Sequence, residues 1–255
     1  MPVEVVVLNA RSDNYAYLVR DEATGKVASI DAPEERAIAR ALDERGWGLD
    51  QIWITHHHGD HTEAVDALRD RYGATVIGHV NDRARLPALD RELSEGETVA
   101  LGQTTARVID VSGHTIGHIA YVLDDDHVAF TADSLMALGC GRVFEGTHAM
   151  MWESLSKLMA LPGETLIYSG HNYGQANGRF ALTIEPENAN LIARIERIKA
   201  ADKAGDPIVP VTLAEELATN PFLRAREPGV KTALGMAGAD DAAVFAEIRR
   251  RKDNF

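Results

Sequence analysis

The chain carries ten histidines, and four of them fall within six positions, beginning at His56. A short apolar run leads into this cluster and predicts a buried strand that ends there. Side chains alternate on an extended strand, so His56 and His58 point the same way, whereas His57 points elsewhere and is not expected to be a ligand. After a glycine turns the chain, Asp60 and His61 can face a second point nearby. Imidazole and carboxylate groups bind zinc, iron or manganese, so this run predicts ligands for two neighbouring cations.

Two divalent cations need more ligands than one run of residues supplies. Three further side chains, His114, Asp133 and His171, lie beside small residues at the ends of predicted strands, where loops gather into a site. Taken singly, each is more typical of a structural polar residue. Together with the first run they predict one shared metal site. We interpret His118 and His127 as structural, His118 as a partner of a ligand.

The hydrophobic pattern predicts the elements that position these side chains. Strands are expected at residues 3–8, 15–20, 27–30, 51–55, 74–77, 104–111, 118–123, 127–131 and 166–169. Helices are expected at residues 33–45, between His61 and Gly73, and at residues 152–161, 187–203, 213–218 and 241–252. This order predicts two sheets with helices outside them.

The pattern becomes helical towards the C-terminus, from about residue 177. We therefore expect two domains, the first over residues 1–173 and a smaller helical domain over residues 174–255. The sequence contains no internal repeat and no low-complexity tract.

Charge and composition exclude several classes of partner. The 26 basic and 39 acidic residues give a formal net charge of −13, which disfavours nucleic acid because its phosphates are also negative. No apolar run approaches the roughly 18 residues of a membrane helix, and the first residues do not resemble a secretory signal. The single cysteine, Cys140, is typical of a reducing compartment. We expect a cytoplasmic monomer that binds neither membrane nor nucleic acid.

These motifs resemble the metallo-β-lactamase superfamily and, within it, the hydroxyacylglutathione hydrolase (glyoxalase II) family. The superfamily pattern is the run H-x-H-x-D-H at residues 56–61, followed by His114, Asp133 and His171 in that order. The hydrolase family is matched by residues 130–134, 139–147, 170–173, 185–189, 213–224 and 251–253. The resemblance implies an α/β fold, an αββα sandwich with a catalytic role, followed by a smaller α-helical domain that binds substrate.

The resemblance also implies roles for the metal-ligating residues. One cation would be bound by His56, His58 and His114, and a second by Asp60, His61 and His171. Asp133 would bridge both ions together with a shared hydroxide, which Asp60 could help to orient. The implied cofactors are two divalent ions, most commonly zinc, with iron or manganese also compatible with this ligand set.

Five positions are implied for binding the substrate: Arg142, Phe144, Tyr173, Arg249 and Lys252. Phe144 stands where some members have tyrosine, which removes one phenolic hydrogen bond. Arg249 and Lys252 lie three residues apart on a predicted helix face, a spacing suited to one carboxylate. Glutathione is a net anion at neutral pH, so a basic patch on an acidic protein suits it.

The implied activity is hydrolysis of S-(2-hydroxyacyl)glutathione, typically S-D-lactoylglutathione, to glutathione and D-lactate, the second step of methylglyoxal detoxification. Two cations that share a water lower its pKa, so hydroxide is available at neutral pH. The leaving thiolate has a conjugate-acid pKa near 8.5, so no strong general acid is required. Cys140 is interpreted as a structural thiol rather than a nucleophile.

Two other functions are compatible with part of this pattern. A glutathione-linked persulfide dioxygenase with one iron would share the first half of the chain, but uses fewer metal ligands and lacks the full helical tail. A non-catalytic metal-binding scaffold is disfavoured by the complete set of seven ligands. A β-lactamase or an RNA-processing nuclease is disfavoured by the tail and by the acidic charge.

Overall fold

The computed structural model describes residues 3–255, which form two six-stranded sheets with helices on their outer faces. The first sheet has its strands in chain order, with the first three antiparallel and the last four parallel to one another. Its strands are β1 (Val3–Ala10), β2 (Asn14–Asp21), β3 (Val27–Ile30), β4 (Gln51–Trp53), β5 (Thr75–His79) and β6 (Arg91–Leu93).

The second sheet has the spatial order β14–β13–β10–β9–β8–β7, in which only β10 and β13 run parallel. Its strands are β7 (Thr98–Leu101), β8 (Thr104–Asp110), β9 (Ile119–Leu123), β10 (Val128–Ala132), β13 (Leu166–Ser169) and β14 (Val211–Thr212). A separate hairpin pairs β11 (Leu135–Met136) with β12 (Gly139–Cys140).

The two sheets pack face to face through large aromatic side chains. Tyr17 of the first sheet lies 5.4 Å from Phe130 and 5.2 Å from Tyr168 of the second, measured between ring centroids. Trp53 and Tyr121 make a similar contact at 5.2 Å. Burial of such side chains is the main favourable contribution to a two-layer core.

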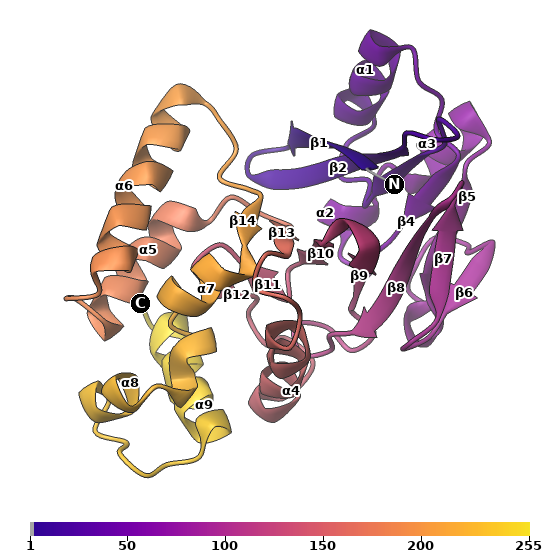
Figure 1. Cartoon of the computed structure of the whole chain (residues 1–255). Helices are drawn as coiled ribbons and strands as arrows, with labels where there is room; N and C mark the ends of the chain where they lie inside the picture. The colour runs from indigo at the N-terminus through magenta and orange to yellow at the C-terminus, as the bar shows by residue number, and fades with distance from the viewer. Residues whose placement is uncertain (1–2) are drawn as a thin grey trace.

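Helices cover both outer faces, and Figure 1 shows the N-terminal helices and the C-terminal helices at opposite sides of the molecule. The helices associated with the sandwich are α1 (Glu35–Arg45), α2 (Gly59–Thr62), α3 (Val65–Tyr72), α4 (His148–Met159) and the short 3₁₀ turns η1 (Val80–Asp82) and η2 (Asp124–Asp126). On the first sheet, Ile38 and Leu42 of α1 and Leu68 of α3 belong to one buried cluster with Ile52. This is the αββα arrangement that the family resemblance implies, and it agrees with the two sheets and outer helices predicted from the sequence pattern.

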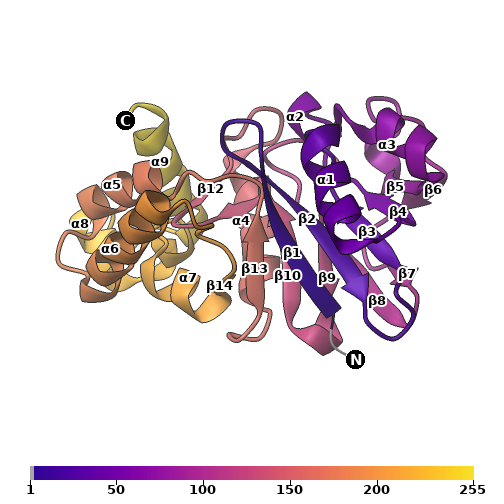
Figure 2. The same cartoon turned by 90° about the horizontal axis from the view of Figure 1, so that it is seen from above.

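The C-terminal helices form a layer beside the second sheet, seen from above in Figure 2. They are α5 (Gly174–Ile184), α6 (Ala189–Ala204), α7 (Leu213–Thr219), η3 (Leu223–Arg226), α8 (Pro228–Ala233) and α9 (Asp241–Asp253). The tail also supplies β14, and Phe245 of α9 shares a buried cluster with Leu155 of α4. The tail therefore packs directly on the sandwich. Within residues 3–255, no helix is long and apolar enough to cross a membrane.

Most predicted elements are present within a few residues, with informative exceptions. Helix α4 begins at His148 rather than residue 152, because the side chain of Thr147 accepts a 3.2 Å hydrogen bond from the backbone N–H of Met150 and caps the helix there. Helix α5 was not predicted, since glycines lower helix propensity. A Cβ atom added at Gly178 would lie 2.9 Å from Ile195, so this glycine permits close packing of α5 on α6. Strands β6 and β7 and helix α8 were also not predicted.

Candidate active site

Loops at one end of the sandwich bring the candidate ligands together. His56 and His58 follow β4, His114 lies between β8 and β9, and Asp133 and His171 follow β10 and β13. Just beyond β4, the carboxylate of Asp31 accepts 2.8 Å hydrogen bonds from both the N–H and the hydroxyl of Thr55, which fixes the backbone that leads into His56.

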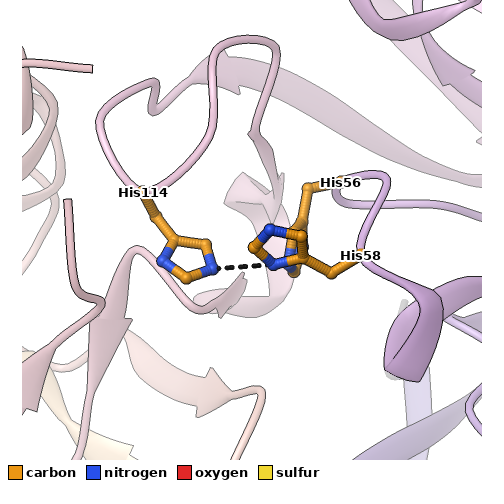
Figure 3. A group of neighbouring side chains, drawn as sticks. All are labelled: His56, His58 and His114. Atoms are coloured by element: carbon orange, nitrogen blue, oxygen red, sulfur yellow. Dashed lines mark hydrogen bonds between the residues drawn. The ribbon is translucent and has the colours of Figure 1, made fainter. Parts of the chain in front are cut away.

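The first group of ligand atoms belongs to three histidines. Nε2 of His56 and Nε2 of His114 each lie 3.1 Å from Nδ1 of His58, and Figure 3 shows the three rings converging. Burial lowers the pKa of all three, and neighbouring histidines lower those of His56 and His58 further. Neutral imidazoles present lone pairs, so this group has the geometry and the protonation state of a metal site.

The second group lies beside the first and contains Asp60, His61 and His171. Nε2 of His171 lies 3.3 Å from both Nε2 of His61 and Oδ2 of Asp60. Although burial alone would lower it, hydrogen bonds from His171 to Asp133 and Asp60 raise the pKa of His171 to about 11. The pKa of His171 is raised because carboxylates surround it, and a divalent cation bound at Nε2 would balance the same negative charges in place of the proton.

Asp133 lies between the two groups. Its Oδ2 is 3.4 Å from Nε2 of both His114 and His171, and its Oδ1 is 3.5 Å from Nε2 of His61. Burial would raise its pKa, but His61 and His171 hold that pKa well below its usual range. Among the described residues Oδ1 is buried without a hydrogen-bond partner. A carboxylate in this position fits a bridge between two cations, so the seven side chains fit the metal pair that the sequence implies.

Several partners of these ligands were not identified from the sequence. Nδ1–H of His61 donates to Asp31 at 2.7 Å, Nδ1–H of His171 donates to Asp13 at 2.8 Å, and Nδ1–H of His114 donates to the Arg142 carbonyl at 2.7 Å. Each contact directs Nε2 towards the centre of the site. Asp31 directly follows the strand predicted at residues 27–30. A polar residue at the end of a predicted strand is the signal that identified the candidate ligands, so the same signal could have identified Asp31.

The other histidines of these segments do not join the cluster. His57 turns away, with Nδ1 3.2 Å from Asp82 and Nε2 3.4 Å from Glu145. The buried ring of His118 stacks on His56, with ring centroids 4.5 Å apart and an angle of 12° between the planes. His118 therefore contacts a candidate ligand by stacking. His127 lies in a turn outside β10, at a φ of 52°.

A cavity of about 390 Å³ opens over the cluster and combines residues of the sandwich and the tail. Five candidate ligands contribute to it, together with all five predicted substrate positions. The lining consists of His58, Asp60, His114, Asp133, Met136, Cys140, Gly141, Arg142, Phe144, His171, Tyr173, Asn177, Arg249 and Lys252. A depression of about 410 Å³ over β1 and α1 contains none of these residues.

The basic residues of the cavity differ in how far their charges are already paired. Arg249 is buried and donates to the Cys140 carbonyl at 3.0 Å and to Asp253 at 2.9 and 3.1 Å. Arg142 is more exposed and lies 3.4 Å from the same Asp253 oxygen. Lys252 has no carboxylate partner within residues 3–255, and burial, with Arg249 nearby, lowers its pKa to about 8. Lys252 is therefore the least compensated cation of the three.

Two aromatic rings frame the cavity above the ligands. Tyr173 stacks on His171 with ring centroids 4.8 Å apart, and Phe144 lies 5.3 Å from His114 with 60% of its surface exposed.

Burial raises the pKa of the Cys140 thiol to about 11, so this thiol is protonated at neutral pH.

Comparisons with known proteins agree with this geometry. Residues 13–171 match the model of the metallo-β-lactamase superfamily, and residues 172–255 match the hydroxyacylglutathione hydrolase C-terminus model. The hydroxyacylglutathione hydrolase of Ruegeria pomeroyi is 57% identical and that of Cereibacter sphaeroides (strain ATCC 17025) 58% identical, each over 100% of both chains. Among solved structures, TTHA1623 in a di-iron-bound form has a TM-score of 0.63 and 25% identity, covering 87% of this chain and 100% of that one. The chain therefore belongs to the hydroxyacylglutathione hydrolase family of the metallo-β-lactamase superfamily.

Proposed function

We propose that this protein hydrolyses the thioester of S-(2-hydroxyacyl)glutathione, such as S-D-lactoylglutathione, to glutathione and D-lactate, the second step of methylglyoxal detoxification. One observation carries the proposal: seven convergent metal-ligating side chains lie under a cavity that also contains Arg142, Arg249 and Lys252. The names of the relatives in Ruegeria and Cereibacter support the same substrate class.

The proposed cofactors are two divalent cations. His56, His58 and His114 would hold one, Asp60, His61 and His171 the other, and Asp133 both. Bound there, the ions supply Lewis acidity, which lowers the pKa of water and polarises a carbonyl. We propose zinc, because a set of imidazoles and carboxylates suits it, and the di-iron form of TTHA1623 supports iron as the alternative.

Asp60 and Asp133 are the proposed catalytic carboxylates. Asp133 is buried at the centre of the cluster, whereas Asp60 is partly exposed at the cavity and can accept a hydrogen bond from the attacking water. The side-chain amide of Asn14 donates to Oδ2 and to the backbone carbonyl of Asp60 at 3.0 and 3.1 Å. These two bonds orient the carboxylate, which the neighbouring His171 keeps ionised by lowering its pKa.

Five residues are proposed to bind the substrate: Arg142, Phe144, Tyr173, Arg249 and Lys252. The three basic ones place a positively charged surface beside the cluster, in a protein of net charge −13. Glutathione has two carboxylates and one ammonium group, so the cavity attracts it while most of the surface does not. Lys252 is the proposed direct partner of a glutathione carboxylate. Arg249 contributes to substrate binding mainly by fixing the positions of Cys140 and Asp253 through its hydrogen bonds to the Cys140 carbonyl and the Asp253 carboxylate.

We also propose that residues 1–173 are the catalytic domain and residues 174–255 the substrate-binding domain. The meeting point of the two family models supports this division, as does the cavity, which takes ligands from the first part and Lys252 from the second. A monomer in the cytoplasm is part of the proposal, and the single cysteine favours a reducing compartment.

The test combines metal analysis of the purified protein with the loss of thioester absorbance from S-D-lactoylglutathione. Asp133→Ala is expected to lose both bound metal and hydrolysis. Asp125→Ala, on the exposed turn η2, is the matched control and should retain both. Hydrolysis by metal-free wild-type protein would refute the proposal. Oxygen consumption with glutathione persulfide would instead favour the dioxygenase.

A further inference from the structure

Glu145 follows Phe144 in the segment of residues 141–147, between β12 and α4, and makes three contacts away from the cavity. Its carboxylate accepts a 2.8 Å hydrogen bond from the backbone N–H of Ile116 and a 2.6 Å hydrogen bond from Nη1 of Arg85. Nε2 of His57 lies 3.4 Å from the same carboxylate. None of these contacts involves the metal cluster itself.

Asp82 and Arg85 complete this group, which we call the Glu145 network: His57, Asp82, Arg85 and Glu145. Asp82 has a fully buried carboxylate that accepts from Nε of Arg85 at 2.9 Å and lies 3.2 Å from Nδ1 of His57. Nη2 of Arg85 donates to the Ile116 carbonyl at 2.6 Å. Each acidic side chain thus contacts both basic ones.

The network joins three segments that each carry a residue of the site. His57 belongs to the run that contains the candidate ligands His56 and His58. Ile116 is two residues from His114, and Glu145 is in the segment that presents Arg142 and Phe144 to the cavity. A displacement of any one segment would therefore alter the metal cluster or the cavity lining.

The segment of residues 141–147 lies close to the His114 loop. The backbone N–H of Phe144 donates to the His114 carbonyl at 3.2 Å, and the Arg142 carbonyl accepts from the ring of His114 at 2.7 Å. A Cβ atom at Gly146 would lie 2.8 Å from Gly113, so the two backbones approach more closely than side chains allow. The position of the segment therefore decides the orientation of the His114 ring.

An isolated surface ion pair would not be expected to hold such a position, because exposed pairs contribute little. The Glu145 network differs because its second carboxylate, Asp82, has no exposed surface and must be satisfied by both basic partners. Burial would raise the pKa of Glu145, but the hydrogen bonds from Ile116 and Arg85 lower it overall, so the carboxylate is charged.

We propose that Glu145 is a positioning residue that holds residues 141–147 against the His114 loop, and thereby sets both the His114 ring and the cavity lining formed by Arg142 and Phe144. The part that concerns the cavity rests on the proposed function. The part that concerns His114 requires only that the cluster binds metal.

The experiment compares zinc-loaded wild-type protein with Glu145→Ala and Glu145→Gln. The rate of zinc loss to dipicolinate reports on His114, and KM and kcat for S-D-lactoylglutathione report on the cavity. We expect Glu145→Ala to lose zinc about tenfold faster and to have a KM about tenfold higher, the usual scale for residues that support a metal ligand. Glutamine keeps an acceptor for the Ile116 N–H, so Glu145→Gln should stay within about threefold of wild type in both measurements.

The matched control is Glu92→Gln, which removes the exposed ion pair with Arg83 and should change neither measurement. Zinc loss and KM within twofold of wild type in Glu145→Ala would overturn the inference, as would equal effects of the alanine and glutamine variants. If the alanine variant does not fold, Glu145→Met replaces it, because methionine has a similar size but offers no comparable acceptor for the Ile116 N–H. Zinc loss within twofold of wild type in Glu145→Met would then overturn the inference. If the wild-type protein does not hydrolyse the thioester, the proposed function fails, whereas the comparison of zinc loss still tests Glu145.

Discussion

Asp31 accepts a 2.7 Å hydrogen bond from Nδ1–H of His61 and, through the same carboxylate, 2.8 Å bonds from the N–H and hydroxyl of Thr55. One buried side chain thus orients a candidate ligand and the end of the strand that leads into the ligand run. Because His61 lies 30 residues from Asp31, the contact depends on the pairing of β3 with β4.

Replacing Asp31 by alanine is expected to lower the affinity for zinc by about 10- to 100-fold, since His61 would lose the group that fixes its tautomer. Competition with a chromogenic chelator measures this affinity. Asp31→Asn, which can still accept one bond from Thr55, should lie between wild type and alanine. Asp43→Ala, on the exposed side of α1, is the control. An unchanged affinity in Asp31→Ala would contradict the assignment.

The lowered pKa of Lys252 leads us to expect that substrate binding depends on pH. Its pKa is lowered to about 8, so the ammonium is charged below that pH and is progressively lost above it. Because the charged form attracts a carboxylate, kcat/KM should fall as the pH rises through about 8. Arginine stays charged in this range, so Lys252→Arg should lack this decline. Lys203→Arg, at the end of α6, should retain the wild-type profile.

A decline of kcat/KM that is identical in wild type and Lys252→Arg would assign the titration to another group.

Arg249 should not tolerate replacement by lysine. Its guanidinium makes hydrogen bonds to Cys140 and Asp253 in fixed directions, and one ammonium cannot reproduce them all. Leaving the buried Cys140 carbonyl unpaired costs about 1–3 kcal/mol of unfolding free energy. Urea denaturation measures this loss. Arg250→Lys, on the exposed face of the same helix, should denature like wild type.

Two glycines in helices are expected to respond to alanine in opposite directions. At Gly178 a Cβ atom would lie 2.9 Å from Ile195, so Gly178→Ala should destabilise the protein by about 1–3 kcal/mol through overpacking. At Gly229 of α8 nothing lies within 4 Å of the added Cβ atom, so Gly229→Ala should stabilise it by about 0.5–1 kcal/mol. Thermal unfolding measures the stability of both variants relative to wild type. A Gly178→Ala variant more stable than wild type would contradict the close contact between α5 and α6.

Whereas the αββα class was implied by the family resemblance, the residue pattern by itself predicted two sheets with helices outside them, the positions of most strands and the candidate ligands that converge in the cluster. This was possible because alternation along a strand and 3.6-residue spacing along a helix are local properties, and because ligands at strand ends meet at one edge of a sandwich. Helix α5 was not predicted, because its glycines are accounted for only by tertiary contacts: a Cβ atom at Gly174 would meet Ile208, and one at Gly178 would meet Ile195.

Only the tertiary structure decided which polar groups support the cluster. Asp13 and His171 are 158 residues apart, and Asp253 pairs with both Arg142 and Arg249. The Glu145 network likewise joins residues from three separate segments. No local pattern predicts such pairs, because they depend on how sheets and loops bring distant segments into hydrogen-bond distance, and burial then makes each unpaired charge costly.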